Sequence, residues 1–279
     1  MRLTFLGTGT SHGIPVLGCD CAVCSSMDPR DNRYRSSVLI EGNDGEHILI
    51  DAGPEFRLQA LRAGLHHLDA VLVSHAHADH VHGLDDVRPL CRNRQMSVWA
   101  SENDAAEIRE RFSYAFRAGQ PGGGKPRFDL GIAPPEGVAI GRLRAIPVPL
   151  MHGDRRILGY RIGGLSYLTD CSGIPASSMP LLEGTDVLVL DALRTRPHPT
   201  HFSISEAFDV ARLIAPGQLY LTHLCHDHSH QALEELCRKA GLPFPAFPAY
   251  DGLVVDVQEQ VRASVLPGAP LSLEIEPRT

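Results

Sequence analysis

The sequence predicts a layered α/β sandwich. Short apolar runs alternate with helical stretches along most of the 279 residues, and no obvious linker interrupts them. Many strands with interspersed helices on a chain of this length are typical of layered α/β folds. A hydrophobic fraction of 43% and a charged fraction of 21% are ordinary for a globular protein with a sizeable core. We assign residues 1–258 to one domain and residues 259–279 to a peripheral C-terminal tail.

Apolar runs of strand length predict the β-strands, and longer amphipathic stretches predict the helices. The strands are expected over residues 2–7, 36–42, 47–53, 69–75, 95–101, 143–150, 157–164, 165–170, 185–192, 217–223 and 252–257. The helices are expected over residues 54–64, 81–92, 102–116, 175–183, 203–214 and 230–240. The helix from Ser203 begins with SISE, in which Glu206 stands at the position that a capping box requires.

Residues 111–128, RFSYAFRAGQPGGGKPRF, break this alternation. They contain four glycines and two prolines among aromatic and basic residues. We predict a long surface loop here, which either closes over a pocket or merely connects its neighbours.

Charge and cysteine content exclude several classes of protein. A net charge of −7 gives no overall attraction to nucleic acid or acidic membranes. No window approaches eighteen apolar residues, and the N-terminus MRLTFLGTG does not resemble a signal peptide, so we expect a cytoplasmic protein without a membrane span. Three of the seven cysteines lie within residues 19–24, which suits metal-bound thiolates in a reducing compartment better than a disulfide framework.

The stretch SHAHADHVHG, residues 74–83, is the strongest signal for a metal site. His75 and His77 lie on the loop that leaves a predicted strand, where an i, i+2 spacing points two imidazoles the same way. Asp79 and His80 follow at the start of the next helix, displaced enough to serve a second ion. Imidazole and carboxylate ligands suit divalent metals such as zinc or manganese.

Three more candidate ligands stand at the ends of predicted strands. His152 follows AIPVPLM, Asp170 ends LSYLTD and His223 ends QLYLTH. A carboxylate has two oxygens, so Asp170 is the natural ligand to bridge two cations.

Taken in order, these residues resemble the metal-binding set of the metallo-β-lactamase superfamily, and FLGTGTSHGIP and ILIDAGPEF resemble its opening strands. The resemblance covers residues 1–257 and implies an αββα sandwich with a binuclear metal site at the sheet edges. It assigns one metal to His75, His77 and His152. It assigns the other to Asp79, His80 and His223, with Asp170 as the bridge.

A second group of metal ligands is expected near the N-terminus. Cys19, Cys21 and Cys24 in GCDCAVC have C-x-C-x2-C spacing, and three thiolates need a fourth ligand to close a tetrahedral structural zinc site. The pattern resembles the phosphoribosyl cyclic phosphate phosphodiesterase (PhnP) group, in which a histidine three residues after the last active-site histidine completes such a site. That residue is His226 here, and Cys225 stays open as the alternative.

The segment RTRPHPTHFSISEA carries the candidate general acid. The phosphodiesterase branch of the superfamily has a non-ligand histidine between the bridging aspartate and the last ligand, and His201 matches it. A departing alkoxide needs a proton, which a histidine can supply. His198 is the alternative acid. Arg194 and Arg196 either meet a substrate phosphate or are solvated surface charges.

These features predict a binuclear metal-dependent phosphoric diester hydrolase. We expect a small, cyclic, phosphoribosyl-type substrate, a hydroxide shared by two zinc or manganese ions as the nucleophile, and one structural zinc. His201 is the expected acid, and Asp79 is expected to help orient the nucleophile. The resemblance suggests a homodimer.

Two alternatives remain open at this point. A tRNA 3′-end-processing ribonuclease shares the catalytic set, but its tRNA arm lies between the positions of His152 and Asp170, where this chain has only seventeen residues. A carrier protein of pyrroloquinoline quinone biosynthesis shares the cysteine pattern but has an eroded histidine motif. HAHADH is intact here, and the chain is acidic, so neither a carrier nor a nucleic-acid substrate is expected.

Overall fold

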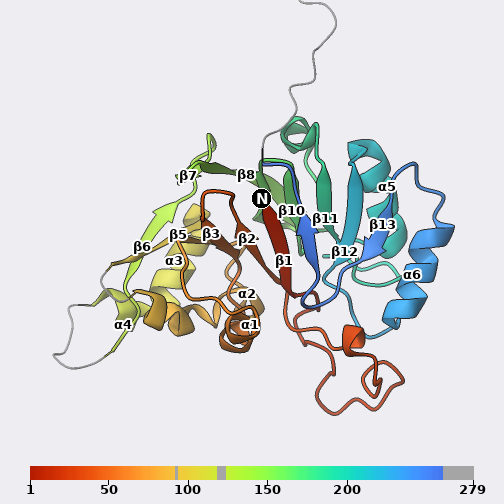
Figure 1. Cartoon of the computed structure of the whole chain (residues 1–279), viewed down its shortest axis with the longest axis horizontal. Coiled ribbons are helices and arrows are strands. Elements are labelled where there is room, and N and C mark those ends of the chain that lie inside the picture. The colour runs from red at the N-terminus through yellow and green to blue at the C-terminus, as the bar shows by residue number, and fades with distance from the viewer. Residues whose placement is uncertain (92–93, 118–123, 260–279) are drawn as a thin grey trace, which may run out of the picture.

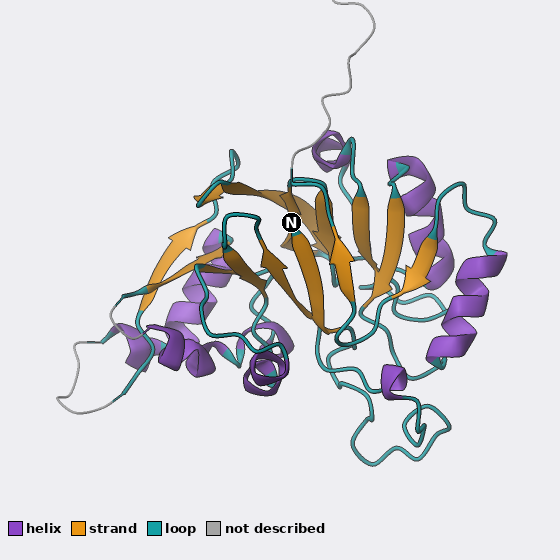
Figure 2. Cartoon of the chain, in the orientation of Figure 1, coloured by secondary structure: helices purple, strands orange, loops and turns teal. Residues whose placement is uncertain are grey.

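A computed structural model describes residues 1–91, 94–117 and 124–259 of the protein. The described strands form two seven-stranded sheets, and helices pack on the outer face of each sheet (Figures 1 and 2). A central apolar core that includes Phe5, Ile40, Tyr160 and Val189 lies between the sheets. This arrangement confirms the predicted α/β sandwich with its αββα layers.

The first sheet contains the N-terminal strands and one C-terminal strand. In spatial order they are β14 (Val254–Asp256), β1 (Arg2–Gly7), β2 (Ser37–Glu41), β3 (His47–Ile50), β4 (Ala70–Leu72), β5 (Met96–Ala100) and β6 (Phe128–Ile132). Neighbours from β3 to β6 are parallel, with Ile48 opposite Ala70 at the start of the β3–β4 register. Parallel strands place their carboxyl ends at one edge of the sheet, where ligand sites commonly form.

The second sheet is built in a similar way. In spatial order its strands are β13 (Ala246–Pro248), β12 (Gln218–Thr222), β11 (Val187–Asp191), β10 (Leu165–Leu168), β9 (Arg155–Ile162), β8 (Leu143–His152) and β7 (Val138–Ile140). Neighbours from β10 to β13 are parallel, and the pairs that involve β8 and β9 are antiparallel. Val187 pairs with Gln218, which sets β11 and β12 in step so that Asp191 and Thr222 end them side by side.

Short helices cover the two outer faces. The first sheet carries α1 (Phe56–Arg62), α2 (Ala78–Val81), α3 (Glu102–Arg111), α4 (Ser113–Phe116) and the 3₁₀ helix η2 (Leu84–Cys91). The second sheet carries α5 (Ile204–Ile214), α6 (His230–Lys239) and the 3₁₀ helix η3 (Ala176–Leu182). Another 3₁₀ helix, η1 (Pro29–Asp31), follows the cysteine-rich loop at the bottom of Figure 1. The capping box predicted for α5 is present, with Ser203 and Glu206 bonded reciprocally.

Three predicted helices differ from the structure. The helix expected over residues 81–92 is instead the end of α2 followed by η2, because the chain turns closely at Gly83, where a Cβ would lie 2.1 Å from the carbonyl oxygen of Gly53. The helix expected over 175–183 is the 3₁₀ helix η3, which contains Pro180. The helix expected over 102–116 breaks at Phe112 into α3 and α4.

The loop predicted over residues 111–128 is wrong at both ends, since it overlaps α4 and the start of β6; residues 118–123 lie outside the described part of the chain. Three short strands, β6, β7 and β13, were not expected. β6, β7 and β13 stand at sheet edges, where little burial is needed and the apolar pattern is weak.

The tail assigned to residues 259–279 lies outside the described residues except for Glu259, so the boundary at residue 258 stays a prediction. Within residues 1–91, 94–117 and 124–259, no helix is long and apolar enough to cross a membrane. The cytoplasmic location and the homodimer stay predictions.

Candidate active site and structural metal site

The predicted active-site ligands come from both sheets and converge on one edge of the sandwich. His75 and His77 lie on the loop after β4, and His152 is the last residue of β8. Asp170 and His223 follow the ends of β10 and β12. Each of these positions lies at the carboxyl end of its strand. This explains why residues so distant in sequence meet here.

The first group of ligand atoms belongs to His75, His77 and His152, and these atoms lie within 4.8 Å of one another. Nε2 of His75 is 2.8 Å from Nδ1 of His77. Nδ1 of His152 lies 2.9 Å from the carbonyl oxygen of Thr200, which accepts its N–H and leaves Nε2 as the coordinating nitrogen. Burial lowers the pKa of His75 well below its usual value, so this imidazole is neutral, as a metal ligand must be.

The second group contains the ligand atoms of Asp79, His80, Asp170 and His223, again within 4.8 Å of one another. Oδ2 of Asp170 lies 2.7 Å from Nε2 of His80 and 3.3 Å from Nε2 of His75. Its Oδ1 lies 2.7 Å from Nε2 of His223. Asp170 therefore contacts residues of both groups, as a bridging ligand would.

The arrangement of these ligand atoms suits the binding of divalent cations better than hydrogen bonding among the ligands themselves. Nε2 of His80 and Oδ1 of Asp170 are buried and have no hydrogen-bond partner among the described residues, although each lies close to other ligand atoms. Buried polar atoms without a hydrogen bond are costly and rare. Nitrogen and oxygen donors that crowd together in this way match the ligand chemistry of zinc or manganese, so the residues present fit two divalent ions.

The backbone at this edge is strained. Asp51, Asp170 and His223 each follow a strand and each have a positive φ, at 63°, 59° and 58°. Residues other than glycine rarely adopt this left-handed conformation, and it persists where the surrounding structure enforces it, often at functional sites. Here the conformation forms the sharp turns that follow β3, β10 and β12.

Asp51 is a supporting residue that was not predicted. Its fully buried carboxylate lies 2.7 Å from Nδ1 of His80 and accepts hydrogen bonds from the backbone N–H and the hydroxyl of Ser74. It thereby fixes the tautomer of His80 and directs Nε2 to the ligand group. The signal was present in ILIDAG, where an acidic residue follows a buried strand.

The predicted general acid, His201, lies against both ligand groups. Its ring stacks on His223 with centroids 4.7 Å apart, and it is 4.8 Å from the ring of His152. Its Nδ1 lies 2.8 Å from Oδ2 of Asp191 and 3.2 Å from Oδ1 of Asp170. Burial lowers the pKa of His201 despite the opposing charges of Asp170 and Asp79.

Asp191 is the second supporting residue that was missed. It is the last residue of β11, between the strands that precede Asp170 and His223, and it is fully buried. The reasoning that selected Asp170 and His223 as strand-end residues applies equally to Asp191. The alternative acid, His198, lies farther out: its Nδ1 is 3.1 Å from the Thr200 hydroxyl, and its ring centroid is 5.0 Å from that of His201.

Asp79 is ionised in this setting. Burial raises the pKa of its carboxyl, but the neighbouring His80 outweighs burial and holds the pKa below its usual value. Oδ2 of Asp79 lies 3.2 Å from Nε2 of His80. The carboxylate is therefore available as a ligand or as an acceptor for a nucleophilic water; both roles stay predictions.

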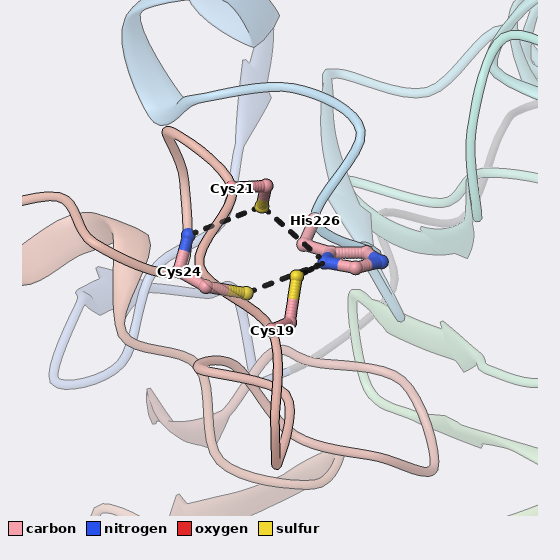
Figure 3. Close-up of side chains that lie close together, drawn as sticks. All are labelled: Cys19, Cys21, Cys24 and His226. Carbon is pink, nitrogen blue, oxygen red and sulfur yellow. Dashed lines mark hydrogen bonds between the residues drawn. The ribbon is translucent and has the colours of Figure 1, made fainter.

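The cysteine-rich loop forms a separate cluster with the segment after His223 (Figure 3). Nδ1 of His226 lies 3.4, 3.5 and 3.3 Å from the Sγ atoms of Cys19, Cys21 and Cys24. Zn–S bonds of about 2.3 Å and Zn–N bonds of about 2.0 Å in a tetrahedron place sulfur and nitrogen about 3.5 Å apart. The four residues fit one zinc ion without rearrangement.

The structure favours His226 over Cys225 as the fourth ligand. Sγ of Cys225 accepts a hydrogen bond from the backbone N–H of Asp227 at 3.4 Å and is not among the four clustered residues. A hydrogen bond from the backbone N–H of Cys24 lowers the pKa of the Cys21 thiol to about 6, which favours the thiolate that zinc requires.

Comparison with known proteins agrees with this geometry. Residues 46–224 match the family model of the beta-lactamase superfamily domain. The chain belongs to the metallo-β-lactamase superfamily. A crystal structure of a diphosphatase from the PhnP family is 40% identical and superposes with a TM-score of 0.84 over 94% of this chain and 99% of that one. The predicted superfamily and the resemblance to PhnP are thus confirmed.

Two further relatives bear on this superfamily member. An octanoyltransferase of Porphyromonas gingivalis is 41% identical over 263 residues, which are 93% of this chain but only 52% of that protein. The chain thus spans about half the length of this relative. Zn²⁺-bound PqqB from Methylobacterium extorquens has the same fold, with 18% identity and a TM-score of 0.74 over 92% of this chain and 100% of that one.

Proposed function

We propose that this metallo-β-lactamase superfamily hydrolase is a phosphodiesterase that cleaves a small, cyclic, phosphoribosyl-type phosphodiester. The observation that carries the proposal is the position of His201, whose ring lies against His152 and His223 of the two ligand groups while its Nδ1 contacts Asp191. A phosphodiester expels an alkoxide, and a histidine held beside the ligands is placed to protonate it.

Different residues of the site bind the cations, orient the water and donate the proton. His75, His77 and His152 would hold one cation, and Asp79, His80 and His223 would hold the other; Asp170 contacts residues of both groups. When bound, two divalent metals lower the pKa of water and withdraw charge from the phosphoryl group. The ionised Asp79 accepts a hydrogen bond from the attacking water and thereby orients it. Asp191 holds His201 so that the proton on Nε2 is the one delivered to the leaving oxygen.

The comparisons support phosphoryl chemistry over the other chemistries of this fold. The PhnP-family structure that is 40% identical is described as a diphosphatase, so phosphoric anhydrides belong among the substrates to test. The name octanoyltransferase belongs to a protein about twice as long, and nearly half of that protein has no counterpart in this chain.

The two alternatives receive less support. Between His152 and Asp170 the chain forms the strands β9 and β10, which leave no segment for a tRNA-binding arm. A non-catalytic carrier does not need two assembled groups of His and Asp ligands with a partly buried histidine beside them.

A hydrolysis screen tests the proposal. The metal-loaded protein is incubated with cyclic and linear phosphodiesters, a nucleoside diphosphate, a β-lactam and a thioester. We expect cyclic ribosyl diesters to be cleaved with the highest kcat/KM. Preferential cleavage of the β-lactam, the thioester or the anhydride would replace the proposal with that chemistry.

A further inference from the structure

The loop that carries His75 and His77 is held by α3, a helix that contributes none of the clustered ligand residues. Asp104 and Arg111 lie seven residues apart on α3, which places them two turns apart on one face of the helix. Oδ1 of Asp104 accepts the backbone N–H of Ala76 at 2.9 Å, and Arg111 donates a hydrogen bond to the carbonyl oxygen of Ala76. Both peptide groups between the two histidines are therefore fixed from this helix.

Asp104 also contacts the hairpin that carries His152. Arg155 is the first residue of β9 and pairs across the hairpin with His152, the last residue of β8. Nη2 of Arg155 forms an ion pair with Oδ1 of Asp104 and lies 2.7 Å from Oε1 of Glu107. One carboxylate thus connects the loop after β4 of the first sheet to the β8–β9 hairpin of the second sheet. These two segments carry all three histidines of the first ligand group.

The Asp104 carboxylate is itself firmly held. It is fully buried in the first turn of α3, where the helix dipole favours a negative charge. Ser101, the N-cap of the helix, donates its hydroxyl to Oδ2, while Ala76 and Arg155 supply the donors to Oδ1. A buried carboxylate with three donors, one of them a guanidinium, has little freedom to move. It can therefore fix the segments that donate to it.

His77 depends on this support more than the other two histidines of its group do. Nδ1 of His152 is held by the carbonyl oxygen of Thr200, and Nδ1 of His75 lies 3.1 Å from the hydroxyl of Ser74. Within the described part of the chain, the ring nitrogens of His77 have a hydrogen-bond contact only with His75, which is another ligand. The place of the His77 ring is therefore set by its backbone.

We propose that Asp104 is a positioning residue of the first cation site, which places His77 through the peptide of Ala76 and aligns it with His152 through Arg155. Groups that orient metal ligands without binding the metal typically contribute roughly 10–100-fold to metal affinity. This role is independent of the substrate, so it goes beyond the proposed function and can be tested without measuring turnover.

Zinc retention tests this role. The metal-loaded wild type, Asp104→Ala, Asp104→Asn and Glu102→Gln are dialysed against buffers of graded free Zn²⁺, and the zinc that remains on each chain is counted. Asp104→Ala should need ~10–100-fold more free Zn²⁺ to keep one of its active-site ions. Asp104→Asn should lose less affinity, because its amide oxygen can still accept the N–H of Ala76. Glu102→Gln removes an exposed carboxylate from the same helical turn and should match the wild type.

Arg155→Met separates the two contacts of Asp104, since it frees the hairpin but leaves the N–H of Ala76 on the carboxylate. It should weaken zinc retention in the wild type and add little to Asp104→Ala, because both changes break the same connection. The zinc of the cysteine site is the internal reference for folding. If Asp104→Ala does not fold, Asp104→Asn and Arg155→Met decide. Wild-type retention in the folded variants, or an equal loss of the cysteine-site zinc, overturns the proposal. Failure to hydrolyse any phosphodiester would count against the proposed function alone.

Discussion

Nδ1 of His201 lies 2.8 Å from Oδ2 of Asp191, and the aspartate is fully buried at the end of β11. A carboxylate at this position accepts the Nδ1–H and leaves Nε2 as the nitrogen that exchanges a proton with a ligand. The pair resembles, in its division of roles, other histidine–aspartate pairs in which the acid group orients the imidazole.

Replacing His201 with alanine should slow the cleavage of an alkyl or ribosyl diester by roughly 10²–10⁴-fold, the usual contribution of a positioned acid. A nitrophenyl diester, whose leaving group is already a stable anion, should be much less affected. The metal content should not change, because His201 is not an assigned ligand. Rates with both leaving groups and metal analysis of the same preparations check this.

Asp170→Ala is the comparison variant for that experiment. It removes the shared ligand, so it should lower the metal content and both rates alike. If His201→Ala also loses metal, or loses equal activity with both leaving groups, His201 is a ligand or a structural residue, and His198 becomes the next residue to test.

Replacing Asp191 with asparagine should lower kcat on the ribosyl diester by ~10-fold to 100-fold or more, because the amide no longer enforces the Nδ1–H tautomer of His201. Like His201→Ala, it should spare the nitrophenyl diester. Asp209→Asn is the matched control, since Asp209 is exposed on α5 and, within the described part of the chain, forms an ion pair only with Arg212. Asp191→Asn kinetics identical to those of the control would show that His201 needs no orientation.

Mild chelation should remove activity before it removes the structural metal. The His and Asp ligands form an open site that exchanges readily, whereas three thiolates and His226 form a closed one. We expect roughly one zinc per chain to remain in a folded, inactive protein. Metal analysis and circular dichroism after dialysis against a chelator measure this. Loss of all metal in a single step would contradict the separation of the two sites.

Replacing Cys21 with serine should lower Tm by roughly 10 °C, since losing several kcal/mol of zinc binding corresponds to ~2–4 °C per kcal/mol in a domain of this size. The specific activity of the protein that stays folded should fall much less. Cys225→Ser is the control, because Cys225 lies next to His226 without joining the cluster. Thermal melts of both variants test this prediction. Equal Tm values for Cys21→Ser and Cys225→Ser would contradict a structural role for Cys21.

The sequence was most informative where function imposes a spacing. The His75 and His77 pair, Asp170 and the cysteine triad were chosen from local patterns, and the structure brings each of them into a cluster. Asp191 and Asp51 also end apolar strands, as Asp170 does, but a strand-end aspartate does not by itself show which residue it will meet. Their importance depends on pairing between strands, which is a property of the fold.

The errors in secondary structure have a similar origin. An amphipathic pattern does not distinguish an α-helix from the 3₁₀ helix η2, which contains Pro89 and follows the close approach of Gly83 to Gly53. β13 ends at Pro248 on a sheet edge, and both features weaken a strand signal. The local sequence therefore does not determine either element: η2 depends on a contact with a segment distant in sequence, and β13 on its place at the edge of the sheet.

The left-handed residues at the strand ends have a consequence for how the protein can change. A side chain in this conformation costs on the order of 1–3 kcal/mol, which glycine would recover. At Asp51, Asp170 and His223 the most stable backbone choice would delete a ligand or its support. Stability and chemistry therefore compete at these three positions. Random mutagenesis selected only for thermal resistance should enrich glycine there and yield robust, inactive proteins, whereas selection for activity should leave the three side chains untouched and find stabilising changes elsewhere.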